Sequence, residues 1–113
     1  MDGWLIVKAG LLFDGTGAAS RNAEVLVGDG RILEVGPAGS IKRPDGPVAE
    51  IDATAGSVIP GLIDCHLHVT YSGHMGMQQL EWPASLELVA ISAGANATRA
   101  LECGYTSGRS ASR

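Results

Sequence analysis

Two histidines, His66 and His68, are the residues of this chain whose type and spacing could carry chemistry. They belong to the mostly apolar stretch 62–69, which follows a Pro-Gly breaker pair at 60–61, so we predict a turn and then a buried strand. Residues two apart on a strand project from one face, which places Asp64, His66 and His68 on the same side. Two imidazoles held in this way offer two nitrogen ligands to a divalent metal such as zinc.

A His-x-His pair is weak evidence for a metal site by itself, because a buried histidine is more often a hydrogen-bonded core residue than a ligand. The context is more specific, since residues 58–69 read Val-Ile-Pro-Gly-Leu-Ile-Asp-Cys-His-Leu-His-Val and fix a turn, a strand and three polar positions together. This string resembles the start of the barrel in the metal-dependent amidohydrolase superfamily, whose members include dihydroorotase, imidazolonepropionase and prolidase-like enzymes. We therefore interpret His66 and His68 as metal ligands.

Before this stretch, the chain has the pattern of short strands joined by tight turns. Apolar, β-branched residues predict one or two strands within 4–13, and alternating residues predict strands at 23–27 and 31–35. The Asp-Gly pair at 29–30 between the last two is a strong hairpin signal, so we expect an antiparallel set of strands. A further strand is predicted over 48–53, followed by a turn at Ala55-Gly56.

The Asp-Gly-Thr-Gly segment at 14–17 could suggest a phosphate-binding loop. It lacks the Gly-Lys-Ser/Thr ending of such loops and is not followed by a helical pattern, so we predict a plain turn.

The segment after the histidines predicts a loop over 70–79 and then a helix. His74 in this loop could contact a substrate, although a solvent-exposed position is the more ordinary interpretation, and Met75 and Met77 could line a pocket or cover the barrel mouth. The helix can begin with Ser85 as N-cap or with Pro83 at its first helical position, and Gly104 is a natural stop. Its apolar stripe, which predicts a face packed on a sheet, consists of Leu86, Val89, Ala90, Ala93, Ala97, Ala100 and Leu101.

Tyr105-Thr106 is typical of the start of a second strand, and the resemblance to the superfamily extends to this point. Residues 107–113 are rich in serine, arginine and glycine, so we expect them to form no barrel strand and to be disordered. We interpret this tail as the result of a truncated or frame-shifted gene, with a genuine short protein as the second interpretation.

The resemblance implies a fold in two parts. Residues 1–57 would be the β-rich N-terminal portion of a small β-sandwich, and residues 58–106 the first strand, loop and helix of a TIM-type (β/α)8 barrel, with 107–113 outside the family pattern. It also implies a metal-dependent hydrolase of carbon–nitrogen bonds other than peptide bonds, acting on a small-molecule substrate, in a family whose members are often oligomeric. Of the family's functional residues, His66 and His68 carry over as metal ligands and Asp64 as a supporting residue, whereas no catalytic residue does.

Two histidines are fewer than the roughly three protein ligands of a catalytic zinc, so we expect a catalytically incomplete chain. The alternatives are a small metal-binding or interaction module and a non-functional gene remnant. The 113 residues carry a formal net charge of -4, so their composition does not indicate binding to nucleic acid or to an anionic membrane. No apolar run approaches the roughly 20 residues of a membrane helix. The first residues have neither a basic region nor a long apolar region, so we expect no secretory signal. Two distant cysteines favour the cytoplasm.

Overall fold

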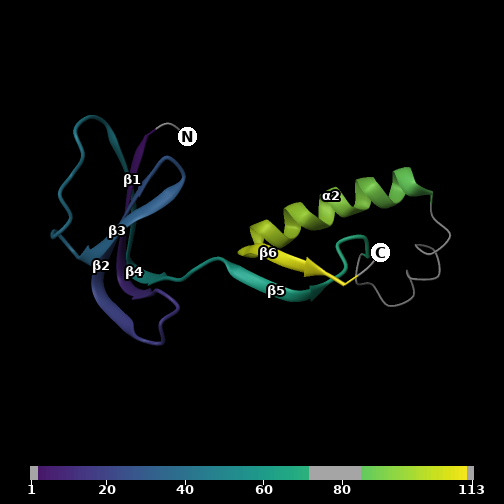
Figure 1. The fold of residues 1–113 in the computed structure, drawn as a ribbon, viewed down its shortest axis with the longest axis horizontal. Coiled ribbons are helices and arrows are strands. Elements are labelled where there is room, and N and C mark those ends of the chain that lie inside the picture. The colour runs from purple at the N-terminus through teal and green to yellow at the C-terminus, as the bar shows by residue number, and fades with distance from the viewer. Residues whose placement is uncertain (1–2, 72–84, 112–113) are drawn as a thin grey trace. The chain divides into compact units, whose positions relative to one another are not determined.

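A computed structural model describes residues 3–71 and 85–111 of the chain. The chain divides into two compact units, Met1–Pro60 and Gly61–Arg113, and the boundary in the sequence falls within the Pro-Gly pair. Figure 1 labels the elements of each unit.

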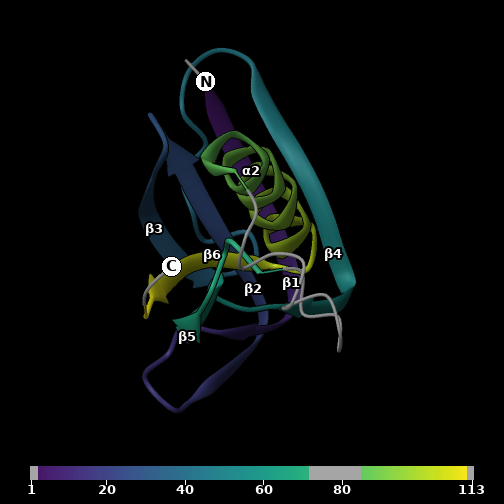
Figure 2. The ribbon, with the colours of Figure 1, turned by 90° about the vertical axis from the view of Figure 1, so that its right-hand side faces the viewer.

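The first unit is a four-stranded sheet in the order β3-β2-β1-β4. Its strands are β1 (Trp4–Phe13), β2 (Ala19–Gly28), β3 (Arg31–Pro37) and β4 (Val48–Val58). Figure 2 shows β1 lying between β2 and β4. The segment 4–13 is thus one continuous strand, and the segment 14–17 is the turn we predicted, in which the Asp14 carboxylate accepts hydrogen bonds from the backbone and hydroxyl of Thr16.

The hairpin between β2 and β3 confirms the prediction made from Asp29 and Gly30. Both residues have positive φ, 50° and 71°, as a two-residue turn of the type that matches the strand twist requires. β1 also pairs antiparallel with β2, in register from Trp4 opposite Gly28 to Phe13 opposite Ala19.

The expectation of a wholly antiparallel set is wrong for β4, which pairs with β1 in parallel. The loop after β3 leads past the hairpin to the free edge of β1. There β4 begins and runs in the same direction as β1. The predicted turn at Ala55-Gly56 is also wrong, because β4 continues through these residues to Val58. The pairing instead shifts register between Ala9 and Leu11, and a side chain at Gly10 would collide with the carbonyl oxygen of Thr54.

The core of the first unit lies over β1 and β2. Ile6, Leu26 and Ile41 form one buried cluster, with Trp4 and Val48 packed against it. A second buried cluster is made of Ala9, Leu12, Ala23 and Val25. Ile41 reaches the core from the loop after β3, because the buried Glu24 carboxylate accepts hydrogen bonds from the backbone amides of Gly39 and Ile41, each 3.0 Å long.

We predict that acid destabilises the first unit through Glu50 on β4. The Lys8 ammonium, 2.7 Å from Glu50, and the Arg43 guanidinium lower the pKa of that carboxyl below its ordinary value. A lowered pKa in the folded state adds stability above the unfolded-state pKa, and this stability is lost as the pH falls through the folded-state pKa. Urea unfolding from pH 7 down to pH 3 should show this loss, and Glu50→Gln should reduce the pH dependence. An unchanged pH profile in the variant would contradict the prediction.

The described part of the second unit consists of two parallel strands and one helix between them in the sequence. β5 (Leu62–Leu67) is followed by α2 (Leu86–Glu102) and then by β6 (Tyr105–Ser110), which runs parallel to β5. Ser85 is the N-cap of α2, its hydroxyl accepting a hydrogen bond from the Leu88 amide at 3.4 Å, and Gly104 ends the helix with a φ of 90°. Within residues 3–71 and 85–111, no helix is long and apolar enough to cross a membrane.

The expectation that residues 107–113 form no strand and are disordered is wrong for residues 107–110, which belong to β6. Ser107, Gly108 and Ser110 pair with β5, since a parallel ladder is formed by backbone groups and does not require apolar side chains. Gly108 is well suited to its position, because a Cβ there would collide with the Leu67 side chain. Residues 112–113 lie outside the described part of the chain.

The apolar stripe of α2 is covered only in part. Val89, Ala93 and Ala100 are half-buried, whereas Leu86 and Leu101 are 71% and 61% exposed. No described residue of α2 is fully buried. Two strands are too narrow a surface to cover the whole stripe, so the predicted core face is only partly formed.

Candidate metal centre

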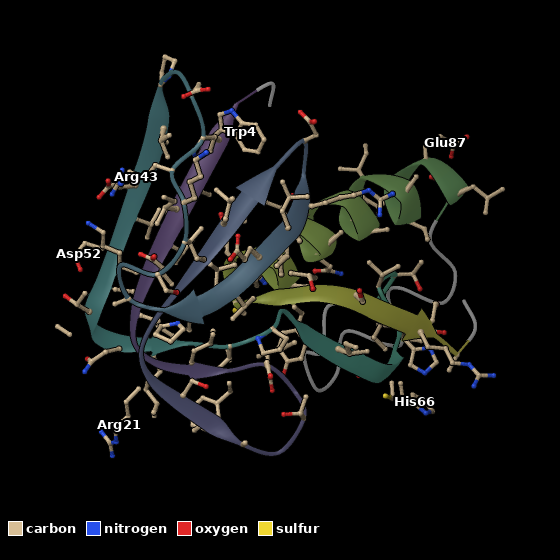
Figure 3. The ribbon with its side chains drawn as sticks, turned by 60° about the vertical axis from the view of Figure 1, so that its left-hand side comes forward. Trp4, Arg21, Arg43, Asp52, His66 and Glu87 are labelled. Atoms are coloured by element: carbon tan, nitrogen blue, oxygen red, sulfur yellow. The ribbon has the colours of Figure 1, made fainter. Side chains whose placement is uncertain are left out.

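The two histidines meet at the end of β5, where Figure 3 shows the His66 side chain. The strand ends at Leu67, so His66 lies within it and His68 just beyond it, which shortens the predicted strand by two residues. The Nε2 atoms of the two rings are 3.2 Å apart, and the ring planes are inclined by 61°. The rings therefore project to the same side, as the spacing of the two residues predicts.

The separation of the Nε2 atoms fits one tetrahedral metal ion. Histidine nitrogens bind zinc at roughly 2.0–2.1 Å, so two such ligands of one tetrahedral ion stand about 3.3 Å apart. The observed 3.2 Å is close to this distance. Both nitrogens can act as ligands when the ring protons are on Nδ1, because each Nε2 then presents a lone pair.

Asp64 supports His66 through the backbone. The ladder between β5 and β6 shifts register between Asp64 and Leu67, where β5 carries one residue more than β6. At this irregularity the Asp64 carboxylate accepts a hydrogen bond of 3.0 Å from the His66 amide. β-bulges of this kind can redirect a side chain, and here the carboxylate satisfies an amide that lies within the irregular part of the ladder.

The backbone after His68 folds into a turn that the helix contacts. The Tyr71 amide donates a hydrogen bond of 3.0 Å to the His68 carbonyl, and the rings of these two residues lie 5.3 Å apart. From α2, the Asn96 side chain donates hydrogen bonds to the carbonyls of Val69 and Tyr71. Sequence reasoning missed Asn96, although a polar amide among the alanines of the helix is a signal that could have identified it.

The structure brings together two side chains that could serve as metal ligands, His66 and His68. Within residues 3–71 and 85–111, no group of three or more His, Cys, Asp or Glu side chains is placed to hold a metal ion. The cysteines Cys65 and Cys103 are exposed free thiols. His74, Met75 and Met77 fall outside the described residues, as does the alternative helix start at Pro83.

The chain is similar in sequence and in fold to known proteins. The chain is 33% identical over 99 residues to a dihydroorotase of Citrifermentans bemidjiense, a match that covers 88% of this chain and 21% of that protein. It is 42% identical over 65 residues to an imidazolonepropionase of Stenotrophomonas maltophilia, covering 57% of this chain and 16% of the relative. A solved prolidase in complex with N-methylphosphonate-L-proline superposes with a TM-score of 0.77 at 28% identity, over 96% of this chain and 26% of the prolidase. No family model matches the chain.

The chain belongs to the metal-dependent amidohydrolase superfamily. Its β-rich first part, with a mixed sheet, corresponds to the N-terminal β-sandwich domain of the superfamily's solved members. The chain spans between about a sixth and a fifth of the length of these two curated relatives.

Proposed function

We propose that His66 and His68 are the first two ligands of an amidohydrolase metal site and that zinc is the metal they bind. The observation that carries this proposal is the 3.2 Å separation of the two Nε2 atoms, which matches two ligands of one tetrahedral ion. The activity that we propose for the protein is hydrolysis of a carbon–nitrogen bond other than a peptide bond in a small-molecule substrate. The relatives named dihydroorotase and imidazolonepropionase support this class.

In this proposal the chain's own residues hold and orient the metal. A bound divalent metal supplies a hydrolytic nucleophile by lowering the pKa of its water to roughly 7. His66 and His68 each provide an Nε2 lone pair, and the Asp64 carboxylate fixes the backbone from which the His66 ring projects. The contacts of Asp64 thus suit a supporting residue rather than a ligand.

We also propose that β5, α2 and β6 are the first strand, the first helix and the start of the second strand of a (β/α)8 barrel. The support is the parallel pairing of β5 with β6, which precede and follow α2 in the sequence. In such barrels the active site lies at the carboxyl ends of the strands. His66 and His68 lie at this end of β5.

We predict that the 113-residue chain alone hydrolyses no amidohydrolase substrate at a metal-dependent rate. A catalytic zinc takes about three protein ligands and an open position, and the described residues supply two. The test is a panel of cyclic amides, lactams and acylated amino acids, assayed with added zinc against a His66→Ala control. Zinc-dependent turnover that His66→Ala abolishes would show that the chain is a complete enzyme.

We propose that the protein is located in the cytoplasm, and its two cysteines support this proposal. Cys65 and Cys103 are both free thiols in the structure, as expected of a protein in the reducing cytoplasm. Mass spectrometry of the protein alkylated in intact cells would test this, since two alkylated cysteines are expected and a disulfide between them would contradict it.

A further inference from the structure

The position of His68 depends on the backbone beyond the end of β5. The hydrogen bond from the Ala111 amide to the Leu67 carbonyl, 3.0 Å long, lies at the end of the strand pair. His66 is inside the ladder, whereas His68 belongs to the turn that follows. The separation of the two Nε2 atoms therefore depends on the conformation of this turn.

Asn96 of α2 contacts this turn at two points. Its side-chain nitrogen donates to the Val69 carbonyl at 2.9 Å and to the Tyr71 carbonyl at 3.1 Å, which uses both amide hydrogens. Within the turn, the Tyr71 amide is bonded to the His68 carbonyl. The three hydrogen bonds tie the residues that follow His68 to each other and to the helix.

The local sequence supports a specific role for Asn96. Its neighbours in α2 are Ala95 and Ala97, and asparagine is a poorer residue than alanine in a helix interior. The side chain is half-buried and lies on the side of the helix that also carries Val89 and Ala93, where an apolar residue would be expected. Together with His68, it lines the hollow between α2 and the strands.

We propose that Asn96 is a positioning residue that holds His68 at metal-binding distance from His66. This inference rests on the proposed metal site and adds a determinant that lies 28 positions from His68 on a different element. Removing the amide releases the turn, so that the His68 ring samples orientations in which its Nε2 no longer faces that of His66. Substitution of groups that orient metal ligands typically weakens binding by about 10- to 100-fold.

The test is a zinc chloride titration of the full 113-residue chain in a Cys65→Ser, Cys103→Ser background, which removes the two exposed thiols as competing zinc ligands. The titration is observed by NMR of the labelled histidine rings. We expect Asn96→Ala to weaken zinc binding about tenfold and to move the His68 ring signals in the zinc-free chain more than those of His66. Asn96→Asp keeps the shape but replaces the donors with acceptors, so it should be as weak as Asn96→Ala. Asn96→Gln retains the donors on a longer arm and should recover part of the affinity.

Thr98→Ala is the matched control, since it removes an exposed side-chain hydrogen bond to the Gly94 carbonyl in the same helix and should leave zinc binding unchanged. Helical circular dichroism should be equal in all these variants. Wild-type zinc affinity and unmoved His68 signals in Asn96→Ala and Asn96→Asp would overturn the inference if His66→Ala still weakens binding. Wild-type affinity in His66→Ala would instead overturn the proposed metal site, and this inference with it.

Discussion

Ile6→Ala should lower the free energy of unfolding of the first unit by about 2–5 kcal/mol, the usual range for an isoleucine truncated in a packed core. Ile6 is 1% exposed and is the largest fully buried side chain among the described residues. It packs with Leu26 and Ile41, which belong to the neighbouring strand and to the loop after β3. A cavity at Ile6 therefore weakens contacts with two other segments of the first unit.

Urea denaturation of the full chain, followed by circular dichroism, measures this effect. Ile32→Ala is the matched control, because it makes the same chemical change on β3 at a side chain that is 69% exposed. That variant should stay within about 0.5 kcal/mol of the wild type. Equal losses in the two variants would show that the core does not lie over β1 and β2.

His66→Ala and His68→Ala should each weaken zinc binding by at least about tenfold, or about 1.4 kcal/mol. Two nitrogens at 3.2 Å can bind one ion together, and a single imidazole loses this advantage. The double variant should therefore lose little more zinc affinity than either single variant, because each single change already destroys the paired site. Wild-type affinity should itself be modest, since two protein ligands are fewer than a stable site uses.

Calorimetry in a Cys65→Ser, Cys103→Ser background measures this prediction, because the two exposed thiols could otherwise bind zinc. Thr98→Ala in the same background controls for an unrelated change on α2. Independent, additive losses in the two histidine variants would mean that the rings bind separate ions. Such a result would contradict the paired site.

Features with local causes could be predicted from the sequence. The hairpin at Asp29 and Gly30 depends on two consecutive positive φ angles, which Asp-Gly adopts readily. The convergence of His66 and His68 follows from their spacing at the end of an extended segment, and Ser85 and Gly104 mark the helix ends by their capping chemistry.

Features that depend on distant segments could not be predicted. The parallel pairing of β4 with β1 is decided by which sheet edge is free after the hairpin forms, and no short pattern records this. β6 forms in a serine-rich segment because β5 offers it a backbone ladder and because Gly108 leaves space for Leu67. Similarly, the hydrogen bonds from Asn96 to Val69 and Tyr71 connect residues that are far apart in the sequence.

The measurement that tests the metal site most directly is anomalous diffraction at the zinc edge from crystals of the chain grown with zinc. The arrangement of the rings predicts one anomalous peak roughly 2.0–2.1 Å from the Nε2 atoms of both His66 and His68. A peak at Cys65 or Cys103 with none between the two rings would contradict it.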